Sequence, residues 1–328
     1  MKKSSLLSCL IIGLFLTFQS CRRHPEIPIT IERLEHSLFS IPIDSVAEFI
    51  PRLEQQYGEL FDLYTNRIIR IGLSSNPNFP EELTRFLTDS TMNIVYRRVM
   101  EVFPDLEDLE RDLGRAFYNF RREFPDRVVP RVYTLMSGFN RKMITSDTIL
   151  AISLDKYLGR DEEMYFLLGT HRYLRQTMDR KYLAVDCMRA WIYTEFPFEN
   201  VTENVLNNIL YEGKVMYAVH RLLPKTPDSI LFGFTPEQMR WCQNNKARMW
   251  TALVENRLLF STDFMTISRL IDPAPFTGTF SNESPGRAAV WLGYRIIASY
   301  MRRNNVTLEE LLLDNDYQQI LNRARFRP

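Results

Sequence analysis

The chain has 328 residues, of which 45% are hydrophobic and 25% charged, and its formal net charge is +1. This is the composition of an ordinary globular protein, and the length is sufficient for a sizeable core in one large domain or two. Because the charges are nearly balanced, a general electrostatic attraction to nucleic acid is excluded.

A short apolar run opens the chain. It covers residues 6–18, follows Lys2 and Lys3, and is succeeded by small residues. About 20 apolar residues are needed to span a bilayer, so the run is too short for a membrane span and has the form of a secretory signal. We expect residues 1–20 to be removed as a lipoprotein signal peptide.

Ser20 directly before Cys21 is typical of cleavage by the lipoprotein peptidase, which leaves a lipid-modified cysteine. Acyl chains on Cys21 would anchor the protein stably in a membrane. Arg22 in place of Asp argues against retention at the inner membrane, so we expect an outer-membrane lipoprotein that faces the periplasm. Ordinary cleavage, giving a soluble periplasmic or secreted protein, stays open. We expect residues 21–30 to form a tether and residues 31–328 a single globular domain.

Helical patterns dominate the first third of that domain. A helix is expected after Asp44, a second over residues 60–71, and another after the proline-rich turn near residue 78. Apolar residues then recur at steps of three and four, which predicts a strongly amphipathic helix. They are Leu106, Leu109, Leu113, Phe117 and Phe120.

The pattern changes to strands near residues 129–155. The segments VVPRVYTLMS and TILAISLDKYL have roughly alternating apolar positions and are rich in β-branched and aromatic residues. The polar segment GFNRKMITSD lies between them. These features predict two strands, arranged as a hairpin in a small sheet.

Helices are expected again from Glu162 onward. Thr235 and Thr307 are each followed three residues later by Gln or Glu, which matches a capping box. Ser284 before Pro285 gives a further helix-start signal. The sequence therefore predicts a mainly α fold of the α+β class, with a minor sheet near its middle.

Two cysteines, Cys187 and Cys242, remain in the predicted domain. An oxidising periplasm would allow them to pair, but two cysteines far apart in a large domain are more often buried thiols. The sequence leaves their pairing open.

The HExxH zinc motif is absent. A zincin of the gluzincin type has that motif on one helix and a glutamate ligand on a later helix. The segment NNILYEGKVMYAV, which contains Glu212, resembles the glutamate-ligand helix of a predicted zinc peptidase family. When Glu212 is aligned with that glutamate ligand, Asp186, Cys187 and Ala190 stand where the His, Glu and His of HExxH would be. The resemblance implies a degenerate zincin-like fold without peptidase activity, in which the two helices cross beside the small sheet.

A rival register places His171 first and arginines at the later positions, but its distance to Glu212 is longer. Neither register supplies the ligands of a zinc site, so no metal and no other cofactor is predicted. A purely structural explanation is equally open. In that explanation Asp186 pairs with Arg189 one turn on, and Glu212 pairs with a buried Arg or caps a turn.

The C-terminal half contains the ordered series LYEGK, TPEQ, ENRLLFSTD, PAPFT, ESPGR and WLGYRII. Together with the lipoprotein signal, this series resembles the gliding-motility lipoprotein GldB family of Bacteroidetes over essentially the whole mature chain. The resemblance implies an envelope lipoprotein that is needed for gliding and linked to the associated secretion apparatus. It implies partners among the other envelope proteins of that machinery, and it supplies no enzymatic activity.

The WLGYRII helix includes Arg287, Trp291 and Arg295 at steps of four, which places them on one face or its flank. Gly286 and Gly293 would let another helix approach closely. One interpretation is a former peptidase groove that now holds a partner segment. The other is a core helix with buried Arg–carboxylate pairs.

The sequence as a whole predicts a non-enzymatic lipoprotein with a structural or partner-binding role, attached to the membrane through Cys21. Two alternatives remain, a divergent zinc metallohydrolase with an unrecognised ligand set and a periplasmic ligand-binding lipoprotein. A well-formed apolar pocket with convergent polar groups would favour the latter.

Overall fold

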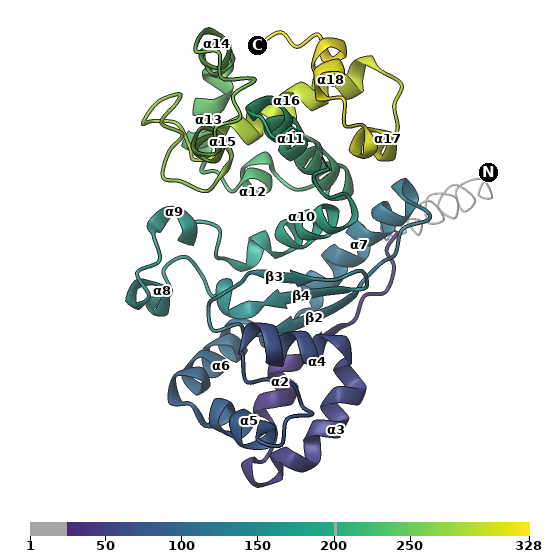
Figure 1. Ribbon diagram of the computed structural model, residues 1–328, viewed down its shortest axis with the longest axis vertical. Coiled ribbons are helices and arrows are strands. Elements are labelled where there is room, and N and C mark those ends of the chain that lie inside the picture. The colour runs from purple at the N-terminus through teal and green to yellow at the C-terminus, as the bar shows by residue number, and fades with distance from the viewer. Residues whose placement is uncertain (1–24, 200–201) are drawn as a thin grey trace, which may run out of the picture.

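The computed structural model describes residues 25–199 and 202–328. Cys21 and the predicted signal peptide lie outside the described residues. The described part is elongated, with N-terminal helices at one end, a small sheet in the middle and C-terminal helices at the other end (Figure 1). It is mostly helical with one mixed sheet, which confirms the predicted fold class.

The sheet of the described residues has the strand order β1-β2-β4-β3. Its strands are β1 (Ile31–Arg33), β2 (Arg131–Leu135), β3 (Met143–Thr145) and β4 (Ile149–Ser153). β1, β2 and β4 run parallel, and β3 lies antiparallel to β4 at the edge.

The predicted hairpin is therefore wrong. The two expected strands, β2 and β4, are neighbours but pair in parallel. Parallel neighbours need a crossover of about a dozen residues or more. The segment between them, which we interpreted as a turn, is long enough to make that crossover and also contributes the edge strand β3.

Both faces of the sheet are buried. Tyr133 and Ala151 pack into a cluster with the N-terminal helices, while Val132 and Leu150 pack into the larger cluster that continues into the C-terminal helices. Successive side chains of a strand point to opposite faces, so each strand contributes to both clusters.

The N-terminal helices cover one face of this sheet. They are α2 (Leu34–Phe39), α3 (Val46–Tyr57), α4 (Glu59–Leu63) and α5 (Phe79–Thr88). α6 (Ser90–Val102) follows, and its buried Val95 and Val99 pack into the larger cluster instead. The expected helix over residues 60–71 is shorter, because α4 passes into a single π turn at Tyr64–Ile68. Asp44 lies in a 3₁₀ turn and makes no capping bond to α3.

The amphipathic helix is confirmed as α7 (Glu107–Glu123), whose apolar stripe is buried in the larger cluster. Gly114 of α7 lies against the start of the described chain. The backbone N–H of Ile27 donates to the Gly114 carbonyl over 3.1 Å, and a Cβ at Gly114 would come within 2.6 Å of the Ile27 oxygen.

The remaining helices form the C-terminal half. They are α8 (Glu163–Leu167), α9 (Arg172–Arg175), α10 (Leu183–Glu195), α11 (Val205–Leu222), α12 (Asp228–Phe232), α13 (Pro236–Asn244), α14 (Lys246–Glu255), α15 (Phe264–Ile271), α16 (Ala288–Arg303), α17 (Leu308–Leu313) and α18 (Tyr317–Ala324). The capping boxes at Thr235 and Thr307 are confirmed. The expected cap at Ser284 is not, because α16 begins only at Ala288, four residues later, with Arg287 at its N-cap position.

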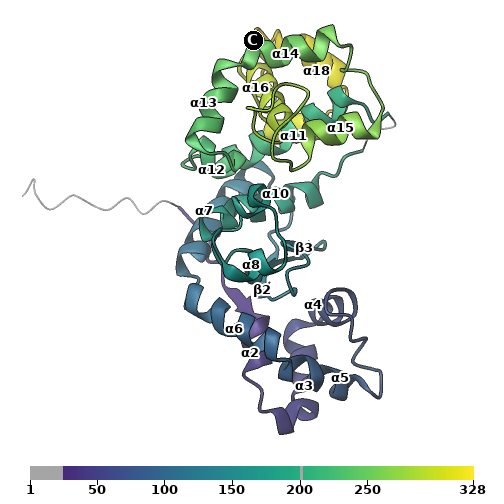
Figure 2. The ribbon, with the colours of Figure 1, turned by 90° about the vertical axis from the view of Figure 1, so that its left-hand side faces the viewer.

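Helices α11 and α16 pack closely at the centre of the C-terminal half (Figure 2). A Cβ at Gly213 would come within 2.4 Å of the Gly293 backbone, and one at Gly293 within 2.0 Å of the Ile209 oxygen. Gly293 therefore permits the close helix approach that its sequence position suggested. Gly286 instead permits the approach of a loop, at the carbonyl of Ala274.

Throughout residues 25–199 and 202–328, every helix falls short of the length or apolar character that crossing a membrane requires.

Candidate functional site

A cleft of about 350 Å³ lies between the sheet and the C-terminal helices. It is formed by the residues before β3, α9 and the turn after it, the start of α10, the end of α12 and the loop between α15 and α16. Its charged lining is Lys142, Lys156, Asp186, Arg189 and Arg287. Its apolar lining includes Tyr173, Leu174, Tyr182, Ile230, Phe232 and Phe234.

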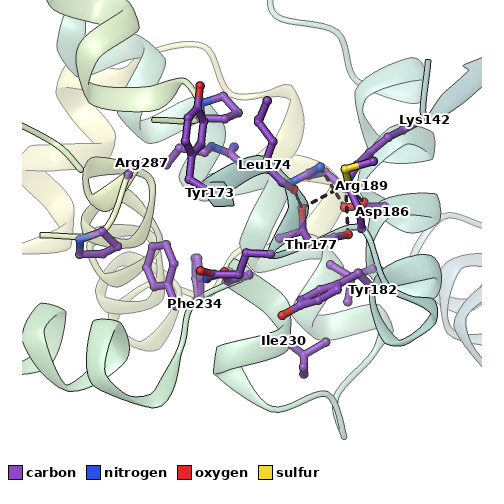
Figure 3. Close-up of a pocket in the computed structure, with 18 of the residues that line it drawn as sticks. Lys142, Tyr173, Leu174, Thr177, Tyr182, Asp186, Arg189, Ile230, Phe234 and Arg287 are labelled. Atoms are coloured by element: carbon purple, nitrogen blue, oxygen red, sulfur yellow. Dashed lines mark hydrogen bonds and ion pairs between the residues drawn. The ribbon is translucent and has the colours of Figure 1, made fainter. Parts of the chain in front are cut away.

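Asp186 of α10 is the centre of a polar network on one side of the cleft. Its Oδ2 accepts from Lys142 Nζ at 2.9 Å and from the Tyr157 hydroxyl at 2.8 Å. Its Oδ1 accepts from Arg189 Nη2 at 2.9 Å. Figure 3 shows Asp186 bonded to Lys142 and Arg189, Lys142 bonded in turn to Thr177, and Phe234 across the cleft.

This network holds Asp186 in its ionised form. Burial alone would raise the pKa of Asp186, but the charges of Lys142 and Arg189 outweigh burial and lower it below its ordinary value. Burial raises the pKa of Tyr157 well above its ordinary value, so its hydroxyl stays protonated and donates to Asp186.

Glu212 of α11 is the centre of a second network behind the cleft. It accepts from the Tyr193 hydroxyl at 2.7 and 2.8 Å and from Arg287 Nη2 at 2.9 Å. Arg189 lies near both carboxylates. Burial would lower the pKa of Arg189, but Asp186, Tyr193 and Glu212 together raise it.

A tight turn sets the position of Thr177 and, through it, of Lys142. Gly233 ends α12 in the left-handed conformation, with φ of 68°, and a Cβ there would come within 2.5 Å of the Thr177 side chain. The Gly233 carbonyl accepts from Gln176 Nε2 at 2.6 Å. Lys142 Nζ then donates to the hydroxyl and the carbonyl of Thr177, at 3.1 and 3.3 Å.

A strained loop sets the position of Arg287. This residue precedes α16 with φ of 61°, the left-handed region that favours glycine. The Thr277 hydroxyl accepts from the N–H of Ala288 at 3.0 Å and donates to the carbonyl of Pro285 at 2.8 Å. These bonds fix the loop, and Arg287 Nε donates to the Ile271 carbonyl at 2.8 Å.

A family model described as gliding motility protein GldB matches residues 20–328. The chain belongs to the GldB family. GldB is a lipoprotein family, so this protein is a component of gliding motility and a lipid-anchored protein of the cell envelope. No functionally curated protein and no solved structure matches the chain.

The structure brings together only some of the residues that the sequence singled out. Asp186 and Arg287 line the cleft, while Glu212 lies behind it and is joined to Arg287. Cys187 is fully buried and Ala190 half-buried.

The expected common face of the α16 helix is only partly present. Trp291 is buried, and the Arg295 guanidinium lies 5.7 Å from the centre of its ring. Neither residue lines the cleft. Arg287 stands before the helix rather than on its face, because its left-handed backbone turns it toward Glu212.

The observed contacts of Asp186 and Glu212 are those of the purely structural explanation. Asp186 pairs with Arg189 one turn on, and Glu212 pairs with the largely buried Arg287. Within the described residues, no group of three or more His, Cys, Asp and Glu side chains is placed to hold a metal ion. The carboxylates of the proposed zincin register are instead matched to cations, so this donor set does not fit zinc.

Cys187 and Cys242 are both buried free thiols. Burial raises the pKa of Cys187 well above its ordinary value and that of Cys242 to about 12. Because the thiolate is the reactive form, neither cysteine has the properties of a nucleophile.

Sequence reasoning missed most of the cleft. Lys142 lies in the polar segment that we interpreted as a turn, and Thr177 and Phe234 follow short helices without any motif. Their proximity depends on contacts between segments far apart in the chain. The sequence PGR at residues 285–287, where a glycine precedes a charged residue at a helix start, was the available signal that Arg287 belongs to a site.

Proposed function

We propose that this GldB-family protein is a non-enzymatic, partner-binding lipoprotein and that its cleft holds a segment of another protein of the gliding machinery. The proposal includes lipid attachment at Cys21 and a position on the outer membrane facing the periplasm. The observation that supports it most is a cleft with an apolar wall and fixed polar groups, the usual form of a binding site.

The state of the acidic and thiol groups supports a role without catalysis. A general base needs a pKa near the working pH and reach to a substrate. Asp186 has a lowered pKa and accepts from three donors, and Glu212 accepts from Tyr193 and Arg287. The thiols are buried. These groups therefore maintain the structure of the cleft walls.

We also keep the proposal of a degenerate zincin-like fold. Helix α10 packs against α11 and against β3 at the sheet edge, where the Thr194 hydroxyl donates to that of Thr145 at 2.8 Å. The packing of α10 against both α11 and the sheet edge supports this proposal. The alternative of a zinc hydrolase has a direct test in metal analysis of the purified protein. Stoichiometric zinc that is lost in Glu212→Ala would overturn the non-enzymatic proposal.

The partner-binding role is tested by closing the cleft. Leu174 is a half-buried residue of the apolar wall, and Leu174→Glu would place a carboxylate among the arginines of the cleft. Leu313→Glu is a matched control, because Leu313 is exposed at the end of α17 and does not line the cleft. Both variants are produced in a gliding host that lacks its own copy.

We expect both variants to accumulate and to melt like the unchanged protein, whereas only Leu174→Glu abolishes gliding. Normal gliding with Leu174→Glu at normal abundance would overturn the role of the cleft. A periplasmic small-ligand carrier is the second candidate, favoured by the cleft volume. It predicts a small molecule that co-purifies with the unchanged protein and is absent from Leu174→Glu.

A further inference from the structure

We infer that the cleft is a carboxylate-binding site, and that the segment it holds presents a peptide carboxylate next to an apolar side chain. This inference rests on the proposed function, because it names the chemistry of the partner segment. It is based on side-chain N–H groups in the cleft that are held in position but have no hydrogen-bond partner among the described residues.

Two arginines supply those donors. Arg189 has one side-chain hydrogen bond, from Nη2 to Asp186. Arg287 has two, from Nε to the Ile271 carbonyl and from Nη2 to Glu212. Each guanidinium has five N–H groups. Most N–H groups of Arg189 therefore have no partner among the described residues, and neither do the two on Arg287 Nη1. Both side chains line the cleft.

Both guanidiniums are already fixed in position. Their side chains are only 24% and 21% exposed, and each is anchored by a carboxylate, Asp186 for Arg189 and Glu212 for Arg287. A planar guanidinium whose orientation is fixed binds a carboxylate with two parallel hydrogen bonds and loses little side-chain freedom in doing so. Asp186 and Glu212 thus serve as orienting groups rather than competitors.

Lys142 has no N–H group left for a ligand, whereas Lys156 keeps two but offers a point charge rather than the planar fork of an arginine. All three N–H groups of Lys142 are used, on Asp186 and on the hydroxyl and carbonyl of Thr177. Lys156 donates to the carbonyl of Phe139 at 2.9 Å. The lysines nevertheless add charge, because the four cationic side chains of the lining outnumber the two carboxylates paired with them, Asp186 and Glu212, and this excess favours an anionic group.

The apolar wall decides which anion fits. Tyr173, Leu174 and Ile230 are half-buried lining residues, and they leave room for an apolar side chain beside the arginines. A volume of about 350 Å³ holds a small segment, not a folded domain. A free phosphate has no apolar part to bury, so the cleft favours a carboxylate joined to an apolar body.

Ligand-observed NMR on the full-length lipoprotein in detergent tests this inference. The probe is N-acetyl-L-phenylalanine, which combines a carboxylate, a peptide amide and an apolar side chain. Its amide, which lacks the charge, and inorganic phosphate are the comparison probes. We expect the acid to bind at least tenfold more tightly than either.

Arg189→Lys and Arg287→Lys keep the charge but lose the planar fork, so each should weaken binding of the acid about tenfold. Arg302→Lys, on the exposed end of α16, is the matched control and should bind normally. Melting temperatures check that each variant is folded. Equal binding of acid and amide, phosphate binding as tight as that of the acid, no binding at all, or full binding by both cleft variants would overturn the inference.

The outcome for this inference is separable from that for the proposed function. If the acid does not bind but Leu174→Glu still abolishes gliding, the carboxylate inference is wrong and the partner-binding role stands. If the acid binds as expected but Leu174→Glu glides normally, the site exists and its role in gliding is wrong.

Discussion

The Arg287 guanidinium donates to the Glu212 carboxylate over 2.9 Å and joins the loop before α16 to α11. Both side chains are largely buried, at 21% and 13% exposure. Replacing Glu212 by Gln would leave the guanidinium without its charge partner. We expect a loss of about 1–3 kcal/mol in the free energy of unfolding, measured by urea denaturation.

The exposed pair Glu237–Arg240 is the matched control for this measurement. Its two atoms are also close, at 3.0 Å, but the side chains are 72% and 63% exposed. Solvent screens such pairs, so Glu237→Gln should cost much less than Glu212→Gln, mainly through the place of Glu237 in the first turn of α13. Equal effects of the two substitutions would show that Arg287–Glu212 contributes no more than a surface pair.

The contact of α11 with α16 gives a second prediction. A Cβ at Gly293 would lie 2.0 Å from the Ile209 carbonyl oxygen, and backbone cannot move aside as a side chain can. Gly293→Ala should destabilise the protein by about 3 kcal/mol or more. Gly278→Ala, where the added atom meets only ordinary contacts from 3.6 Å outward, should be tolerated. Thermal melting of both variants tests this, and a melting temperature lowered equally in both would contradict the prediction.

Two tryptophans of the C-terminal helices, Trp250 and Trp291, differ in burial. Trp291 is 2% exposed, so Trp291→Ala should cost about 3–5 kcal/mol. Trp250 is only half-buried and packs edge-on against Phe326 at 5.8 Å between ring centres, so its loss should cost less. A larger loss of unfolding free energy for Trp250→Ala than for Trp291→Ala would contradict this ranking.

Lys214 gives a pH-dependent prediction. It is fully buried and donates to the carbonyls of Leu312 and Asp314, at 3.1 and 2.9 Å. Burial lowers its pKa from 10.5 to about 8. Between these values the unfolded chain binds more protons than the folded one, so stability rises with pH across that window and is constant below it.

The size of this effect is about 3 kcal/mol, from roughly 1.4 kcal/mol per pKa unit. Urea denaturation between pH 7.5 and pH 10.5 measures it. Because tyrosines also titrate at high pH, the informative quantity is the difference between the unchanged protein and Lys214→Met. An identical slope in both proteins would exclude Lys214 as the cause.

Local patterns in the sequence predicted local structure well. The stripe of α7 follows from helical periodicity, and the boxes at Thr235 and Thr307 are formed by residues three apart. The parallel pairing of β2 with β4 could not be predicted in this way. It depends on the path of the crossover and on β1, a short strand from the start of the domain.

The cleft was less predictable for the same reason. Asp186 and Arg189 are one turn apart, so their pairing follows from helix geometry. Lys142 lies 44 positions before Asp186, and no periodic pattern connects them. Arg287 was expected on a helix face, and only the backbone conformation at φ of 61° shows why it turns toward Glu212.

The anchor is tested separately from the fold, since Cys21 lies outside the described residues. We expect Cys21→Ala to abolish incorporation of a clickable palmitate analogue and to leave uncleaved precursor or soluble protein. Cys242→Ala is the control, because this buried thiol should carry no lipid and labelling should persist. Normal labelling of Cys21→Ala would disprove lipid attachment at this residue.

Photo-crosslinking in living, gliding cells tests the central claim most directly, that the cleft holds a segment of a partner protein. A benzophenone amino acid replaces Tyr173 in the cleft or, as control, half-buried Tyr118 on α7 outside it. We predict one discrete envelope protein crosslinked from position 173, absent from position 118 and lost when Leu174→Glu is added. A product that forms equally from both positions, or that persists with Leu174→Glu, would contradict the claim.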